Sequence, residues 1–272
     1  GSEFPSKPVR LIAPVAPGGI IDLLARMVGS SLSEQMGRQF VVDNRPGANN
    51  IIGTDLTAKA PPDGYTILIV PGGYAISPSL YRKLPYDTIS DFARVAMIGL
   101  SPYVLAVSSR LGVSDVAGLI HLAKDKPEQI SFSSSGIGNV THLAGELLNL
   151  TAGIRLQHVP YKGTGPLIPD LINGTVPVSI ISFSSGLRYA KTENLRLLGV
   201  ASPKRNPLLP NLRTLSESGL PGYEVSGWYG FIVPAATPEA VIGKLNSAIR
   251  TALRKPDLMK HIADQGVEIV DW

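Results

Sequence analysis

The sequence contains no cysteine, which excludes disulfides, thiolate catalysis and cysteine-held zinc or iron–sulfur centres. Charged residues make up only 17% of the 272 residues, and no block of Lys or Arg resembles a nucleic-acid-binding patch. No apolar run approaches the roughly 20 residues that a membrane-spanning helix needs. A hydrophobic content of 44% is ordinary for a soluble α/β protein and too high for a disordered chain.

Strand-like and helical segments alternate along the chain, a pattern that predicts βαβ units and largely parallel sheets. The expected strands are residues 9–15, 40–42, 66–70, 103–107, 130–132, 176–183 and 195–200. The expected helices are residues 20–35, 50–59, 115–124, 140–150, 166–172 and 238–254, the last with Thr237 as its N-cap. The loops are short and rich in Pro and Gly, which favours two lobes joined by crossing strands over domains on a flexible linker.

The segment Leu11–Arg26, LIAPVAPGGIIDLLAR, is a strand followed by a tight glycine turn and an amphipathic helix. Such a turn exposes unpaired backbone N–H groups at the positive end of the helix dipole, where a carboxylate or phosphate binds. The spacing of Gly18 and Gly19 matches neither the dinucleotide fingerprint nor the Walker loop. The turn therefore binds something smaller than a nucleotide, or it is a structural turn only.

The segment Ser131–Leu148, SFSSSGIGNVTHLAGELL, repeats this construction, with Asn139 or Thr141 as the expected helix cap. Its serines lack the glycine spacing of a nucleophile elbow, and the 4 histidines of the chain show no triad spacing. His142 and Glu146 lie four residues apart, but no third metal ligand is evident. We therefore expect anion binding here, with no metal and no cofactor.

A third glycine-rich turn, YKGTGP at residues 161–166, also links a strand to a helix. Two interpretations remain open for it: a further wall of the same ligand pocket, or ordinary turn chemistry with a solvated lysine.

Eight segments in unbroken order resemble one protein family. They are PSKPVRLIAPVAPGGIIDLLAR, VVDNRPGANNIIGTD, DGYTILI, PSLYRKLPYDTISDF, THLAGELL, VPYKGTGPLIPDLINGTV, ESGLPGYEVSGWYGFIVPAATP and LNSAIRTAL. The family is that of the periplasmic substrate-binding proteins of tripartite tricarboxylate transporters, often called the Bug family. The likeness runs from about Pro5 to the C-terminus.

The resemblance implies an α/β, two-lobed periplasmic-binding-protein (Venus flytrap) fold, each lobe a sheet flanked by helices. Lobe 1 would comprise residues 5–102 and 228–272, and lobe 2 residues 103–227. The implied protein is a periplasmic monomer without catalytic activity. It captures an organic mono- or dicarboxylate between its lobes and delivers it to the membrane subunits of the transporter.

The resemblance also assigns ligand-binding positions, mostly in strand-to-helix turns. They are Ala16, Pro17, Gly18, Gly19, Ile20, Gly73, Tyr74, Ser77, Ser134, Ser135, Gly138, Asn139, Thr141, His142, Lys162, Gly163, Ile181, Phe183 and Ser184.

The chain departs from the family pattern at two places. Ile181 stands where an acidic residue is common, and Ile20 and Ile21 occupy positions that are often small or polar. These departures predict a carboxylate with an apolar body, and poorer binding of amino acids, whose buried ammonium would lack a partner. Alternatively, these side chains pack behind the turns.

Two alternative functions are a ligand-binding accessory of a sensor system and a small carboxylate-acting enzyme. Finally, the first four residues, Gly-Ser-Glu-Phe, match the translation of two adjacent restriction sites. We interpret them as a cloning remnant that replaces a removed signal peptide.

Overall fold

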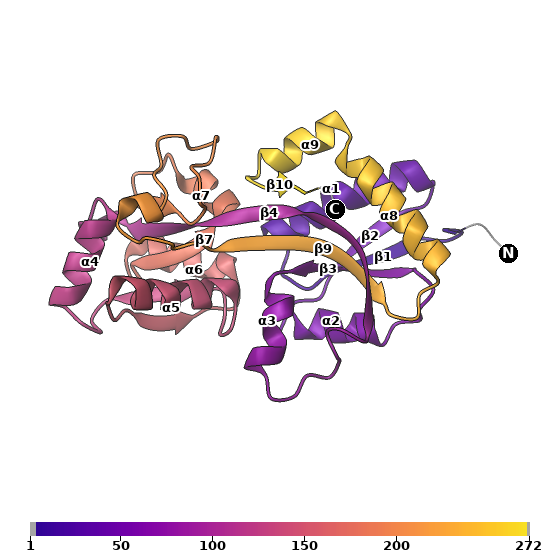
Figure 1. The fold of residues 1–272 in the computed structure, drawn as a ribbon, viewed down its shortest axis with the longest axis horizontal. Helices are drawn as coiled ribbons and strands as arrows, with labels where there is room; N and C mark the ends of the chain where they lie inside the picture. The colour runs from indigo at the N-terminus through magenta and orange to yellow at the C-terminus, as the bar shows by residue number, and fades with distance from the viewer. Residues whose placement is uncertain (1–3, 271–272) are drawn as a thin grey trace. The chain divides into compact units, whose positions relative to one another are not determined.

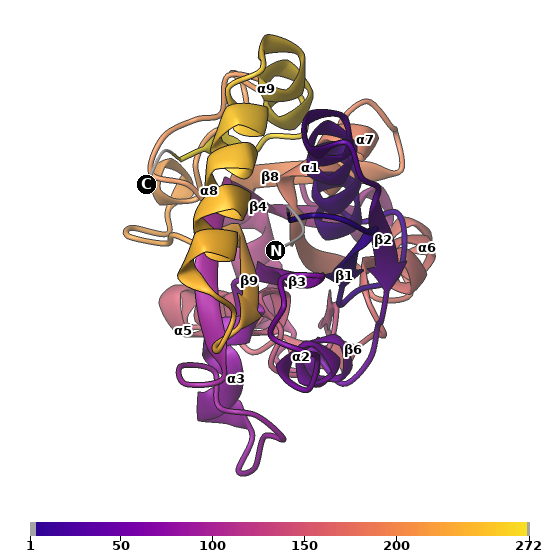
Figure 2. The same ribbon diagram turned by 90° about the vertical axis from the view of Figure 1, so that its right-hand side faces the viewer.

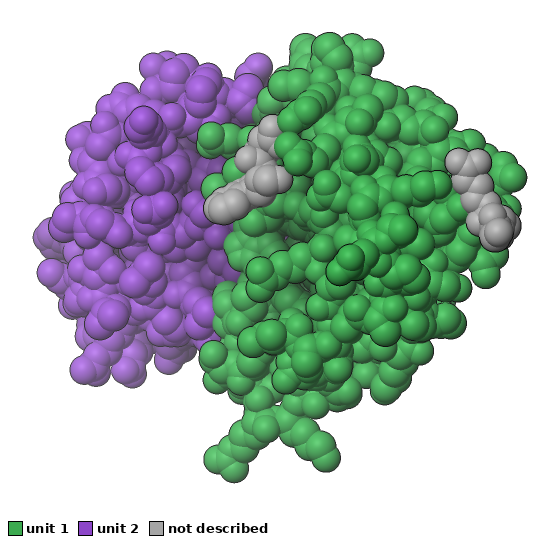
Figure 3. Space-filling view, turned by 45° about the vertical axis from the view of Figure 1, so that its right-hand side comes forward, with its two compact units in different colours: residues 1–100, 228–272 green, residues 101–227 purple. Residues whose placement is uncertain are grey.

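The computed structural model describes residues 4–270. The first three residues of the expected cloning remnant lie outside this range, whereas Phe4 contacts Tyr65 edge to face, with ring centroids 5.0 Å apart. The chain divides into two compact units, residues 1–100 with 228–272 and residues 101–227 (Figure 3). Among the described residues, no helix is both long enough and apolar enough to cross a membrane.

Unit 1 is built on a mixed sheet (Figure 1). Its elements are β1 Val9–Ala13, α1 Ile20–Met36, β2 Phe40–Asn44, α2 Ile51–Ala58, β3 Thr66–Pro71, α3 Gly73–Leu80, the first part of β4 Phe92–Ser108, most of β9 Ser226–Pro234, α8 Glu239–Leu253, α9 Pro256–Ala263 and β10 Glu268–Ile269. The strand order is β2-β1-β3-β9-β4, with β10 also on β4. Strands β1, β2 and β3 are parallel, and β9 pairs antiparallel with β3.

Alternating side chains of this sheet form two apolar layers, as the two-residue period of a strand requires. In β3, Ile67 and Ile69 pack toward α1, α8 and α9, whereas Leu68 and Val70 pack on the face that α2 covers. Figure 2 shows α1, α8 and α9 on one side of the sheet and α2 on the other. Both faces are thus covered, while the ends of the strands carry the turns.

Unit 2 has a second mixed sheet in the order β6-β5-β7-β4-β8. Its elements are the second part of β4, α4 Val116–Asp125, β5 Ser131–Ser134, α5 Val140–Ala152, β6 Gln157–Pro160, α6 Thr164–Asn173, β7 Val178–Ser182, α7 Phe183–Tyr189 and β8 Leu195–Val200. Strand β5 is parallel to β6 and to β7, while β4 pairs antiparallel with β7 and β8.

The core of unit 2 is also divided by its sheet. Leu105 of β4 and Phe132 of β5 pack with α4 and α5, whereas Val104 of β4 packs with Leu167 and Leu171 of α6. As in unit 1, each helix that follows a parallel strand begins at that strand's carboxyl end.

The expectation of largely parallel sheets is wrong for the strands β4 and β9, because β9 runs antiparallel to β3, and β4 runs antiparallel to β7 and β8. The expected N-cap at Thr237 is also wrong. The cap position is Pro238, and the Thr237 hydroxyl donates to the carbonyl of Pro234 at 2.7 Å. The expected cap at Asn139 is confirmed, since its side chain accepts from the amide of Thr141.

Candidate functional site

The polar turns of each unit lie at the carboxyl ends of its parallel strands, where ligands of open α/β sheets bind. In unit 2 these are the turns from β5 to α5, from β6 to α6 and from β7 to α7. In unit 1 they follow β1, β2 and β3. The N-termini of the helices that follow these parallel strands therefore gather at one edge of the sheet in each unit.

The turn between β5 and α5 satisfies most of its own N–H groups. The Ser135 amide donates to the Thr141 hydroxyl at 2.9 Å, and the Gly138 amide donates to Nδ1 of His142 at 3.1 Å. The Asn139 side chain accepts from the Thr141 amide at 3.1 Å. Among the described residues, the amide of Ile137 in this turn has no protein acceptor, and the Ile137 side chain is 66% exposed.

Two histidines support this turn, His142 of α5 and His158 of β6. The rings of His142 and His158 stack with centroids 3.9 Å apart, and Nε2 of His158 lies 2.6 Å from Oγ of the buried Ser134. Burial lowers the pKa of His158, and the neighbouring His142 adds to this effect. His158 is therefore neutral at neutral pH, and the pair braces the turn without carrying two charges.

The turn between β6 and α6 is more open to a ligand. Gly163 is the N-cap of α6 with φ of 108° and no side-chain cap, and within the described chain the amides of Lys162, Thr164 and Gly165 meet no protein acceptor. The Thr164 hydroxyl lies 3.1 Å from that of Ser135, which ties this turn to the β5 turn. Free amides at a helix start beside an exposed lysine form an anion-binding arrangement.

The third turn of unit 2 alternates buried apolar side chains with serines. Ile181 and Phe183 are 1% and 0% exposed and pack in the core with α6. Ser182 caps α7 by accepting from the Ser185 amide, and its hydroxyl lies 3.2 Å from that of the buried Ser184. Ligand contact by Ile181, Phe183 and Ser184 stays a prediction.

In unit 1, the expected residues Ala16–Gly19 form an exposed turn before α1. The N-cap of α1, Gly19, has no side-chain cap. The amides of Gly19, Ile20 and Ile21 reach no acceptor within the described residues. This second uncapped helix start offers the same chemistry as the α6 turn.

The expected residues of α3 make hydrogen bonds within unit 1, and their contact with a ligand stays a prediction. The Ser77 hydroxyl is buried and donates to the carbonyl of Gly73 at 3.0 Å. The Tyr74 hydroxyl donates to the carbonyl of Thr88 at 2.5 Å, and burial raises its pKa above the usual value. Both hydroxyl protons are therefore engaged by backbone oxygens.

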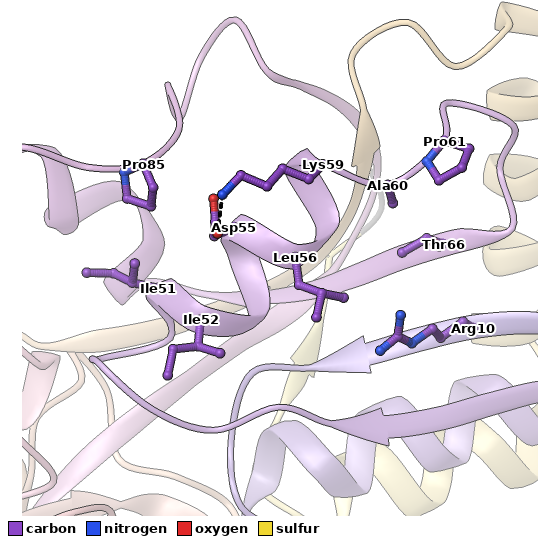
Figure 4. Close-up of a pocket in the computed structure, with 10 residues that line it drawn as sticks. All are labelled: Arg10, Ile51, Ile52, Asp55, Leu56, Lys59, Ala60, Pro61, Thr66 and Pro85. Atoms are coloured by element: carbon purple, nitrogen blue, oxygen red, sulfur yellow. Dashed lines mark hydrogen bonds and ion pairs between the residues drawn. The ribbon is translucent and has the colours of Figure 1, made fainter.

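A surface hollow of about 570 Å³ lies elsewhere in unit 1, between α2 and the strands β1 and β3 (Figure 4). It includes none of the predicted site residues. Its cations are already paired, Arg10 with Asp43 and Lys59 with Asp55 at 2.7 Å. The charges of Arg10 and Lys59 are thus already neutralised by neighbouring carboxylates.

Metal binding finds no support in the side-chain positions. The histidine Nε2 of His142 lies 3.8 Å from Oε1 of Glu146. Within residues 4–270, no three His, Asp or Glu side chains gather in a metal-binding arrangement.

Sequence reasoning missed several residues that shape these turns. Asp22, Arg26 and Asn44 form a network behind the α1 turn, and His158 supports the α5 turn. For His158 the sequence carries no signal, because its partner Ser134 is 24 residues away. For Asp22 and Arg26 the four-residue spacing on a helix was a usable signal.

The family model described as "Tripartite tricarboxylate transporter family receptor" matches residues 24–272. The chain belongs to this receptor family. A relative from Pseudomonas sp. strain P51, a protein in the tcbD–tcbE intergenic region, is 40% identical over 266 residues, which cover 97% of this chain and 79% of the relative.

Several solved structures share the two-lobed α/β fold of this chain. A Rhodopseudomonas palustris protein with adipate is 34% identical at a TM-score of 0.94, covering 98% of this chain and 90% of that one. MatC from the same species, with bound malate, is 27% identical at a TM-score of 0.91. The match covers 98% of this chain and 91% of MatC. The periplasmic binding protein BugD is 32% identical at a TM-score of 0.92. The match covers 98% of this chain and 89% of BugD.

Proposed function

We propose that this protein is a periplasmic solute-binding protein that captures an organic carboxylate and delivers it to a tripartite tricarboxylate transporter. The observation that carries the proposal is the group of free amides at the glycine-rich start of α6 in unit 2, with a similar glycine-rich start at α1 in unit 1. The similar structures with adipate and with bound malate support the ligand class. The similar BugD is a periplasmic binding protein, which supports binding without turnover.

The α6 turn is the main carboxylate anchor in this proposal. Its free amides at Thr164 and Gly165 and the exposed ammonium of Lys162 donate to the carboxylate. Hydrogen bonds to a charged group contribute about 1.5–3 kcal/mol each, so a few of them support micromolar binding after the cost of association. In unit 1, the amides of Ile20 and Ile21 at the α1 turn are donors of the same kind.

The body of the ligand is apolar in this proposal. Ile137 exposes 66% of its surface within the glycine-rich α5 turn, and Ile20 is half-buried beside the α1 amides. Covering apolar surface is favourable by about 25 cal/mol per Å². Neither the α6 turn nor the α1 turn presents a carboxylate to pair an ammonium, since the nearby Asp22 is already paired with Arg26.

A thermal-shift screen of mono- and dicarboxylates tests the function, because a ligand that binds the native state raises its melting temperature. Adipate and malate are the first compounds to test, with adipamide as the uncharged control. We expect stabilisation by a carboxylate and none by the amide. The same samples, analysed for products after prolonged incubation, are expected to contain only unchanged ligand. Product formation by pure protein would instead favour the enzyme alternative.

A further inference from the structure

Asp22 is a buried carboxylate in the first helical turn of α1. It accepts a hydrogen bond from one amide of the glycine turn that precedes the helix. Its Oδ2 accepts from the Gly18 amide at 2.9 Å, and its Oδ1 accepts from Nδ2 of Asn44 at 2.9 Å. Its side chain is only 4% exposed. The carboxylate thus joins the β1 turn, the start of α1 and the end of β2.

Arg26, one helical turn later, contacts both oxygens of this carboxylate. Its Nη2 lies 3.0 Å from Oδ1 of Asp22, and its Nε donates to Oδ2 at 3.1 Å. Its Nη2 also donates to Oδ1 of Asn44 at 3.0 Å. Such a bidentate contact fixes geometry as well as neutralising charge.

The Asp22 side chain stays ionised at neutral pH. Burial opposes ionisation, but the hydrogen bonds from Arg26, Asn44 and Gly18 outweigh it and lower the pKa of Asp22. A fixed negative charge therefore lies behind the amides of Gly19, Ile20 and Ile21. That charge repels an anionic ligand at the same turn unless a cation cancels it.

We propose that Asp22 and Arg26 are a positioning pair that makes the α1 turn receptive to an anionic ligand. Asp22 holds the Gly18 amide and fixes the turn, at which Gly18 adopts a φ of 96°. Arg26 cancels the charge of Asp22, so that the remaining amides attract the ligand's carboxylate. The inference rests on the proposed function, because it concerns carboxylate binding at the α1 turn.

The test is a set of charge variants titrated with adipate by calorimetry. Arg26→Gln leaves the buried Asp22 charge without its cation and is expected to lose about tenfold in affinity. The double variant Asp22→Asn/Arg26→Gln removes both charges and is expected to recover most of the loss. Asp22→Asn alone leaves the Arg26 cation free and is expected to bind adipate more tightly than wild type.

Lys59→Gln provides the matched control, because Lys59 and Asp55 form another four-residue ion pair in unit 1, at 2.7 Å and away from the turn. It is expected to bind adipate as wild type does. Wild-type affinity in Arg26→Gln, or equal losses in the single and double variants, would overturn the inference. If Arg26→Gln does not fold, the Asp22→Asn variant decides the test. An adipate affinity of this variant equal to or lower than that of wild type overturns the inference. Absence of carboxylate binding by wild type is a different result, which removes the proposed function itself.

Discussion

The imidazole rings of His142 and His158 stack with centroids 3.9 Å apart and planes inclined by 18°. Each ring also holds one polar group of the α5 turn, His142 the Gly138 amide and His158 the Ser134 hydroxyl. The Gly138 bond requires an unprotonated Nδ1 on His142. Two stacked rings cannot both carry charge without repulsion, which favours the neutral form of His158.

The first prediction concerns acid stability. The folded-state pKa of His158 is lowered by burial and by His142, so the unfolded chain takes up this proton more readily. The corresponding stability is present above the unfolded pKa near 6.5 and is lost as the pH falls toward the lower folded value. The free energy of unfolding, measured with denaturant, is expected to fall less between pH 7.5 and pH 5.5 in His158→Gln than in wild type. Equal drops would assign the acid sensitivity to other groups.

The second prediction concerns the cap of α5. Asn139→Ala removes the acceptor of the Thr141 amide and is expected to destabilise the protein by about 0.5–2 kcal/mol, the usual cost of losing an N-cap. Urea unfolding measures this loss. Asn139→Asp keeps a side-chain acceptor and serves as the control, with most of the stability retained. An unchanged free energy of unfolding in Asn139→Ala would show that the cap contributes little to the stability of the protein.

The third prediction uses two glycines of the α6 turn. Gly163 has φ of 108° and Gly165 does not need a positive φ, while an added Cβ meets no atom within 4 Å at either position. Gly163→Ala is therefore expected to strain the backbone by about 1–3 kcal/mol and to weaken carboxylate binding. Gly165→Ala is expected to keep both stability and affinity. Matching behaviour of the two variants in calorimetry and unfolding would contradict this account of the turn.

The fourth prediction concerns the apolar body of the ligand. Ile137→Ala is expected to weaken adipate binding several-fold with little change in melting temperature, because the side chain is 66% exposed in the free protein. Leu150→Ala removes an apolar side chain that is 81% exposed at the other end of α5, and it is expected to leave affinity unchanged. Equal affinities of the two variants would remove Ile137 from the ligand-binding surface.

Local patterns predicted many elements because their signals lie within short segments. The strand expected at residues 195–200 coincides with β8, and the helix expected from residue 20 begins at Ile20. The Asn139 cap was predictable because an amide side chain directly before an apolar helix is the usual cap chemistry. These features need no information from distant parts of the chain.

Long-range pairings were not predictable from the same patterns. The β3–β9 ladder joins Leu68 to Ile232, and the contact between Asp22 and Asn44 brings together a helix and the end of a strand. The turn at residues 161–166 indicated a strand before it, but the bounds of β6, Gln157–Pro160, were not predicted because this strand is short and polar and ends in proline. The role of Ile181 also needed the fold, since only the packing shows that its side chain is buried.

The central claim is that free backbone amides and Lys162 hold the carboxylate of an organic acid. Calorimetric titration of the wild-type protein with adipate and, under identical conditions, with adipamide tests it most directly. The account predicts saturable one-to-one binding of adipate and no measurable heat of binding with adipamide. Equal binding of both compounds, or tighter binding of adipamide, would contradict it.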